Sequence, residues 1–120
     1  MIILDTSLWI DHLKAGDERV AFLLKRRQVL IHPFVIGELA LGSMPQYDLT
    51  IRSLSELPQA KLAGNGEVLL LIKQHSLMAT GIGYVDAHLL ASAKLSGARL
   101  LTRDKRLARI AAALDVAAEL

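Results

Sequence analysis

The sequence predicts an α/β fold in which helices cover both faces of a parallel sheet. Short runs of consecutive apolar residues, typical of strands buried on both faces, alternate with longer stretches of helical periodicity. Apolar residues make up 52% of the chain, which is enough to cover two faces of a sheet. The length of 120 residues fits one compact domain, so we expect a single domain over residues 1–120.

Three breaks organise the first half of the chain. An apolar run is followed by Thr6 and Ser7, either of which can cap the next helix. Gly16 interrupts the helical pattern, and Pro33 ends the second apolar run and can open another helix. The expected elements are strands at 2–4 and 29–31 and helices at 8–13, 20–27, 34–41 and 47–57.

Glycine-containing turns divide the second half in the same way. Residues 64–66 and 81–83 are expected turns, and Gly97 suits the left-handed end of a helix. Residues 59–63 are ambiguous and fit a short strand, and 116–118 fit a final edge strand. The sheet is therefore expected to contain four or five strands. The clearer elements are helices at 67–75, 84–95 and 104–114 and a strand at 99–102.

Composition restricts the kinds of site the chain can carry. Cysteine is absent, which excludes disulfides and thiolate metal sites and suits a reducing cytosol. No apolar run approaches the roughly 18 residues of a membrane helix, and no signal peptide is expected. The net charge of +2 indicates only solubility. A soluble cytoplasmic protein without membrane contact is the expectation.

Four of the 12 acidic residues fall where the expected strands end or the following helices begin. In a parallel sheet these places meet at one edge, where ligands bind. Each acid also has a plain structural explanation, as a helix cap, a surface residue or a first-turn acid favoured by the helix dipole. Their coincidence at one edge favours a functional site formed by Asp5, Glu38, Asp86 and Asp104.

The surroundings of two of these acids favour a bound cation. Asp5 follows an apolar run, and Glu38 lies in an apolar segment that we expect to be largely buried. A lone buried carboxylate costs several kcal/mol or becomes protonated. Without cysteine or a convincing histidine partner, the oxygen ligands favour Mg²⁺ or Mn²⁺ over Zn²⁺. Such a site fits hydrolysis of a phosphodiester.

Four short motifs, in their order and spacing, resemble those of the PIN-domain ribonucleases. Within that family the closest resemblance is to the toxins of VapBC-type toxin–antitoxin pairs, and it covers essentially the whole chain. The motifs are LDTS at 4–7 with WID following, IGEL at 36–39, DAHLLASA at 86–93 and LLTRD at 100–104.

The resemblance implies an Mg²⁺-dependent endoribonuclease that hydrolyses RNA phosphodiester bonds, with Mn²⁺ able to substitute. It implies a homodimer, silenced by a small DNA-binding antitoxin whose tail occupies the active-site groove. All four acids would be catalytic, and Thr6, Ser7 and Thr102 would be supporting hydroxyls. The implied metal ligands are Asp5, Asp86 and Asp104, of which Asp5 and Asp86 are the firmest.

Some residues and functions remain open at this point. Arg103 and Lys105 flank Asp104, and with Arg106 they are candidates for binding RNA phosphates. Asp11 is expected on a solvated helix face or in a supporting role. The apolar stripe at 68–72 exceeds one helix face, which indicates burial all round or a subunit contact.

Two other functions compete with the ribonuclease. An aspartate-nucleophile phosphatase also places an acid after the first strand. It typically needs a second acid two residues later, where this chain has Ser7. The other alternative is a PIN-like protein that acts only as a non-catalytic binding partner.

Overall fold

A central sheet of three parallel strands organises the computed structural model, which describes residues 1–119. The strand order is β2-β1-β3, and Ile3 of the middle strand pairs with Leu30 on one side and Leu100 on the other. Successive strand residues point to opposite faces, and in β1 both Ile3 and Leu4 are buried. Both faces are therefore covered. The strands are β1 (Ile2–Leu4), β2 (Val29–Leu30) and β3 (Arg99–Leu101).

The expectation of four or five strands was wrong for residues 1–119, which form three. The two missing strands shrink to single parallel bridges, Ile31 with Gln59 and Leu100 with Ala117. At the first bridge, pairing cannot extend toward Pro58, because proline has no N–H to donate. At the second, Asp115 has a φ of 59°, so the chain is turned immediately before it reaches the sheet.

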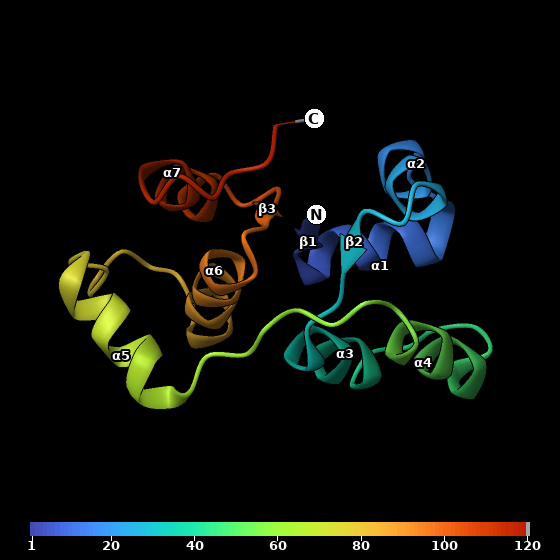
Figure 1. The fold of residues 1–120 in the computed structure, drawn as a ribbon. Helices are drawn as coiled ribbons and strands as arrows, with labels where there is room; N and C mark the ends of the chain where they lie inside the picture. Colours follow the sequence, from blue (N-terminus) through green and yellow to red (C-terminus); the bar gives the residue numbers. More distant parts are fainter. Residues whose placement is uncertain (120) are drawn as a thin grey trace.

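Helices connect and surround these strands. Figure 1 shows α5, α6 and α7 on the side of β3, and α1 to α4 on the side of β2. Helix α6 contacts both β1 and β3, and α1 packs against α2 and α3. The helices of residues 1–119 are α1 (Thr6–Ala15), α2 (Glu18–Lys25), α3 (Pro33–Ala40), α4 (Tyr47–Ser55), α5 (Asn65–Gln74), α6 (Tyr84–Ser96) and α7 (Lys105–Ala113).

Several helices begin one or two residues earlier than the sequence pattern predicted, and in α1 and α5 a side-chain cap accounts for it. Asp5, rather than Thr6 or Ser7, is the N-cap of α1, and its side chain accepts a hydrogen bond from the Thr6 N–H. Helix α5 begins within the expected turn at 64–66, because the Glu67 side chain accepts a hydrogen bond from the N–H of Gly64 at 2.9 Å. That contact caps the first turn and lets the helix start two residues before Glu67.

Helix α5 is only partly covered by the rest of the domain. Val68 and Leu71 are buried against the core, whereas Leu69 is 60% exposed and Leu70 is 54% exposed. The stripe at 68–72 is therefore not buried all round. Within residues 1–119, no helix combines the length and apolar character needed to cross a membrane.

His32 is a buried histidine at the N-cap of α3. Only 1% of its surface is exposed, and its Nδ1 accepts a hydrogen bond from the N–H of Phe34 at 3.0 Å. Burial, together with the charge of the nearby His88, lowers the pKa of His32 from 6.5 to about 4. The ring is therefore neutral near pH 7, where it serves as a helix cap.

We expect the protein to lose stability as the pH falls from about 6.5 toward 4. In this pH range the unfolded chain binds a proton on His32, whereas the folded chain does not. The contribution of neutral His32 to the free energy of unfolding is therefore complete above the range and lost below it. The full loss amounts to about 3 kcal/mol. Urea denaturation at several pH values measures this dependence.

His32→Asn is the matched variant, because asparagine keeps a capping acceptor and does not titrate. Its free energy of unfolding should vary less with pH in this window than that of the wild type. A residual dependence should remain, since burial also lowers the pKa of His88. Identical pH profiles for the two proteins would contradict the assignment to His32.

Candidate functional site

Asp5 lies where β1 ends and α1 begins. Its Oδ1 accepts a hydrogen bond from the N–H of Thr6 at 2.7 Å, and its Oδ2 accepts one from the Thr102 hydroxyl at 2.7 Å. Its own N–H donates to the carbonyl oxygen of Leu101 at 3.0 Å. Asp5 is therefore fixed both to its own helix and to the end of the neighbouring strand β3.

Two threonine residues connect Asp5 to other acids of the site. The Thr6 hydroxyl donates to Oε1 of Glu38 at 2.6 Å, which links α1 to α3. The Thr102 hydroxyl, besides donating to Asp5, accepts a hydrogen bond from the N–H of Asp104 at 3.1 Å. A continuous chain of hydrogen bonds thus runs from Glu38 through Asp5 to the backbone of Asp104.

Asp104 and Asp86 are held by helix N-termini. Asp104 is the N-cap of α7, where its Oδ1 accepts from the N–H groups of Arg106 at 2.8 Å and Leu107 at 3.1 Å. Asp86 lies in the first turn of α6, and its Oδ2 accepts from the N–H of Gly83 at 2.9 Å. Backbone donors and the positive end of the helix dipole therefore stabilise both carboxylates.

Asp86 is near enough to the other three acids to be affected by their charges. Burial raises the pKa of Asp86 above its ordinary value, and the charges of Asp5, Asp104 and Glu38 raise it further. The hydrogen bond from Gly83 acts in the opposite direction. Asp86 thus lies within the repulsive field of the three acids that the sequence predicted beside it.

The burial predicted for Glu38 was wrong, because this side chain is exposed. Helix α3 faces the core with Val35 and Leu39, four residues apart, and this spacing turns Glu38 toward solvent. The argument that burial forces a cation onto Glu38 therefore fails. Its place in the site depends on the hydrogen bond from Thr6 and on the field felt by Asp86.

The donor set fits a hard divalent cation. The site offers carboxylate oxygens and threonine hydroxyls, which are the ligands that Mg²⁺ and Mn²⁺ prefer. Within residues 1–119, no three Asp, Glu or His side chains lie close enough together to hold one ion as they stand. A cation is the species that would offset the mutual repulsion of these carboxylates.

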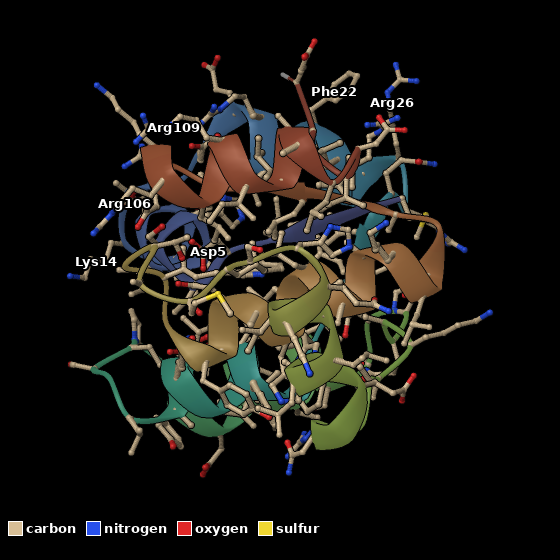
Figure 2. All side chains as sticks on the ribbon, turned by 90° about the vertical axis from the view of Figure 1, so that its left-hand side faces the viewer. Asp5, Lys14, Phe22, Arg26, Arg106 and Arg109 are labelled. Atoms are coloured by element: carbon tan, nitrogen blue, oxygen red, sulfur yellow. The ribbon has the colours of Figure 1, made fainter. Side chains whose placement is uncertain are left out.

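The other residues that the sequence predicted for the site differ in their contacts. Ser7 is exposed in the first turn of α1, and its supporting role stays a prediction. Arg103 forms an ion pair with Asp11 of α1. No local sequence pattern indicates this pair, since the two residues are distant along the chain. Figure 2 shows Lys14, Arg106 and Arg109 on the same side of the molecule as Asp5.

Comparison with known proteins shows which family this geometry belongs to. The family model of the PIN domain matches residues 2–113. The chain is also 48% identical over 118 residues to Ribonuclease VapC32 from two Mycobacterium tuberculosis strains, CDC 1551 / Oshkosh and ATCC 25618 / H37Rv. Each alignment covers 98% of this chain and 95% of the relative.

Repulsion of Asp86 by the other three acids should lower the free energy of unfolding of the metal-free protein. We expect Asp86→Asn to raise the free energy of unfolding at pH 7 by about 1 kcal/mol, because the amide can still accept from Gly83 while the charge is removed. Urea denaturation in EDTA measures the gain. It should shrink in high salt, which screens the repulsion.

Asp48→Asn is the matched control, since Asp48 lies in the first turn of α4. Removing that charge loses a favourable interaction with the helix dipole and should leave stability unchanged or slightly lower. An Asp86→Asn protein less stable than the wild type would contradict the repulsive field.

Proposed function

The chain belongs to the PIN-domain family, and on that premise we propose that it is a divalent-metal-dependent endoribonuclease, the toxin of a toxin–antitoxin pair. The observation that carries the proposal is the network of hydrogen bonds that joins Glu38, Asp5 and Asp104, with Asp86 near enough to be affected by their charges. The name of the relative VapC32 supports RNA as the substrate. The reaction is hydrolysis of the RNA phosphodiester backbone.

Three carboxylates would hold the ion. Asp5, Asp86 and Asp104 each use one oxygen to accept from a backbone N–H at a helix N-terminus, and this fixes the direction of the carboxylate. Mg²⁺, or Mn²⁺ in its place, supplies a Lewis acid that polarises the phosphate and makes a water molecule more acidic. Loss of any of the three should therefore impair ion binding.

Glu38 and the threonines would complete the site. Glu38 is exposed and is oriented by the Thr6 hydroxyl, so its carboxylate is available to accept a proton from the attacking water. Thr102 holds Asp5 from the end of β3, and Thr6 holds it from α1. These two residues act through the carboxylates and are positioning residues.

Basic residues beside Asp104 would bind the RNA backbone. Arg103, Lys105 and Arg106 are all exposed, in the loop before α7 and in its first turn. Phosphate contacts of this kind orient a strand without reading its sequence. Because Arg103 is paired with Asp11, its contribution would require that exposed pair to be shared or opened.

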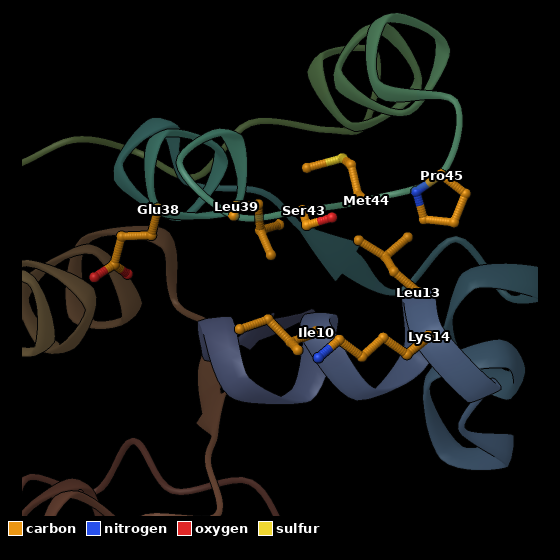
Figure 3. A pocket seen from close by; sticks show the side chains of 9 residues that line it. Ile10, Leu13, Lys14, Glu38, Leu39, Ser43, Met44 and Pro45 are labelled. Carbon is orange, nitrogen blue, oxygen red and sulfur yellow. The ribbon is translucent and has the colours of Figure 1, made fainter.

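The partner of the pair would be a small DNA-binding antitoxin, and an apolar groove beside Glu38 could receive its tail. Figure 3 shows Ile10 and Leu13 of α1 facing Met44 and Pro45 across this pocket, with Glu38 at one end. Leu13 also lines a second apolar pocket against α4, together with Trp9 and Leu49. An apolar segment lying along α1 would cover both pockets and end at the acids.

A homodimer and a cytoplasmic location complete the proposal. The exposed Leu69 and Leu70 of α5 supply apolar surface for a contact with a second copy. An enzyme that cleaves RNA and pairs with a DNA-binding antitoxin acts where both nucleic acids occur, so we place it in the cytoplasm without membrane contact.

We expect Asp5→Asn to abolish Mg²⁺-dependent cleavage of a structured RNA while leaving the fold intact. Asparagine caps a helix as well as aspartate does, so α1 keeps its N-cap, but the amide does not carry the charge that an ion requires. Gel analysis of the RNA measures cleavage, circular dichroism measures the fold, and EDTA should stop the wild-type reaction.

Asp17→Asn provides the matched control for Asp5→Asn. Asp17 is the N-cap of α2 and accepts from the N–H groups of Arg19 and Val20. The same change at this second cap should leave cleavage at the wild-type rate. If Asp5→Asn cleaves as fast as the wild type, the metal-dependent mechanism is wrong. A wild type that fails to cut RNA would favour the non-catalytic binding partner.

Thr102 offers a test of positioning. We expect Thr102→Val to lower cleavage and Mn²⁺ affinity by about 10-fold or more, because Asp5 loses the hydroxyl that orients it. Thr102→Ser keeps a hydroxyl and should restore both. Titration with Mn²⁺ gives the affinity independently of activity. Equal Mn²⁺ affinity for Thr102→Val and the wild type would contradict this role.

A further inference from the structure

Arg106 of α7 lies against the loop that leads into α6. The contact is at Gly81, whose φ of 88° lies in the left-handed region that favours glycine. A methyl group at Gly81 would stand 3.1 Å from Cζ and 3.6 Å from Cδ of Arg106, so the arginine side chain lies directly over the glycine backbone. Glycine suits the backbone angle here, and a methyl group at this position would have to displace the arginine side chain.

This contact joins the supports of two acids. The backbone N–H of Arg106 donates to Oδ1 of Asp104 at 2.8 Å, while its guanidinium reaches Gly81. Two residues after Gly81, the N–H of Gly83 donates to Oδ2 of Asp86 at 2.9 Å. The Arg106 side chain therefore runs from the cap that holds Asp104 to the loop that holds Asp86. Figure 2 places it on the same side of the molecule as Asp5.

The charge of Arg106 is differently placed from those of the paired arginines. Arg19 pairs with Asp17, Arg99 with Asp115, and Arg103 with Asp11. Among the residues that the structure describes, Arg106 has no ion pair. A guanidinium carries five N–H donors in a planar fork that matches a phosphate. Here the fork is exposed and is supported on one side by the Gly81 backbone.

We propose that Arg106 and Gly81 form a binding site for an RNA backbone phosphate beside the four acids. The inference rests on the proposed ribonuclease function and assigns the phosphate contact to Arg106. Four carboxylates repel a polyanion, and the Arg106 guanidinium, which reaches from the cap of α7 to the Gly81 loop, supplies a positive charge where the strand must approach. The guanidinium already packs against the Gly81 backbone, so less side-chain freedom is lost when the phosphate binds.

RNA binding without cleavage tests the site. Asp5→Asn protein in Mg²⁺ would be titrated into a short fluorescein-labelled single-stranded RNA of mixed sequence, and fluorescence anisotropy would give Kd at several salt concentrations. Adding Arg106→Ala should weaken binding about tenfold. The slope of log K against log salt should fall by about 0.7, as expected for one lost phosphate contact with a single strand.

Arg52→Ala is the matched control, because Arg52 is an exposed arginine on α4, away from the Gly81 loop. It should leave Kd and the salt slope unchanged. Arg106→Lys should recover the salt slope and only part of the affinity, since lysine keeps the charge and lacks the planar fork. Unchanged Kd and slope in Arg106→Ala, or an equal loss in Arg52→Ala, would overturn the site.

Gly81→Ala tests the second half of the site without changing any charge. The methyl group would displace the guanidinium, so RNA binding should weaken. In the Arg106→Ala background the same change should cost less binding than in the wild type, because only the backbone strain at Gly81 then remains. Additive losses in folded proteins would overturn the role of Gly81. If Gly81→Ala does not fold, the Arg106 variants alone decide the proposal.

The proposed function and this inference fail in different ways. Wild-type protein that does not cleave RNA in Mg²⁺ contradicts the ribonuclease. Wild-type protein that cleaves RNA, combined with unaltered RNA binding in Arg106→Ala, contradicts only the phosphate site. If Arg106→Ala instead weakens only capture of a protein partner, the guanidinium serves that partner, and the RNA assignment is wrong.

Discussion

Repulsion among four carboxylates at one edge of the sheet is the constraint around which the site is built. Backbone hydrogen-bond donors, rather than neighbouring cations, stabilise these carboxylates. Asp5, Asp86 and Asp104 each accept a backbone N–H at the start of α1, α6 and α7 respectively. Every helix start contributes partial positive charge, so three helices converge on the negative region and make it tolerable without a bound ion. The parallel sheet creates this convergence, because it brings the starts of successive helices to the same edge.

That arrangement explains how much of the site could be predicted from the sequence. Asp5 and Asp104 come shortly after apolar runs, and such runs indicate where a strand ends. Asp86 follows a glycine that opens a helix. The burial argument for Glu38 was wrong, because an apolar segment does not reveal which face of its helix is buried. Val35 and Leu39 settle that question, and only the packing of α3 shows it.

Contacts between distant segments set the limit of that prediction. Arg103 and Asp11 form an ion pair, and Arg106 covers Gly81, yet nothing in the local pattern of any of the four residues indicates its partner. Strand number was missed for a related reason. The segments at 59–63 and 116–118 can pair with the sheet, but the length of pairing depends on what precedes each segment. Here Pro58 and the turn at Asp115 limit each to one bridge.

The cations near the acids divide between holding the fold and serving the ligand. Arg103 and Asp11 tie the loop after β3 to α1, which keeps Thr102 close to Asp5, although both members of the pair are exposed and the pair adds little stability by itself. Arg106, three residues further along, packs against the Gly81 backbone and forms no ion pair within residues 1–119. A guanidinium that packs against a glycine backbone can attract an anion with its full positive charge. A guanidinium paired with a carboxylate attracts an anion less strongly, because the carboxylate partly cancels its field. Two arginines three residues apart can therefore differ in role. Arg103 faces the carboxylate of Asp11 and holds the fold, whereas Arg106 faces Gly81 and is available to a ligand.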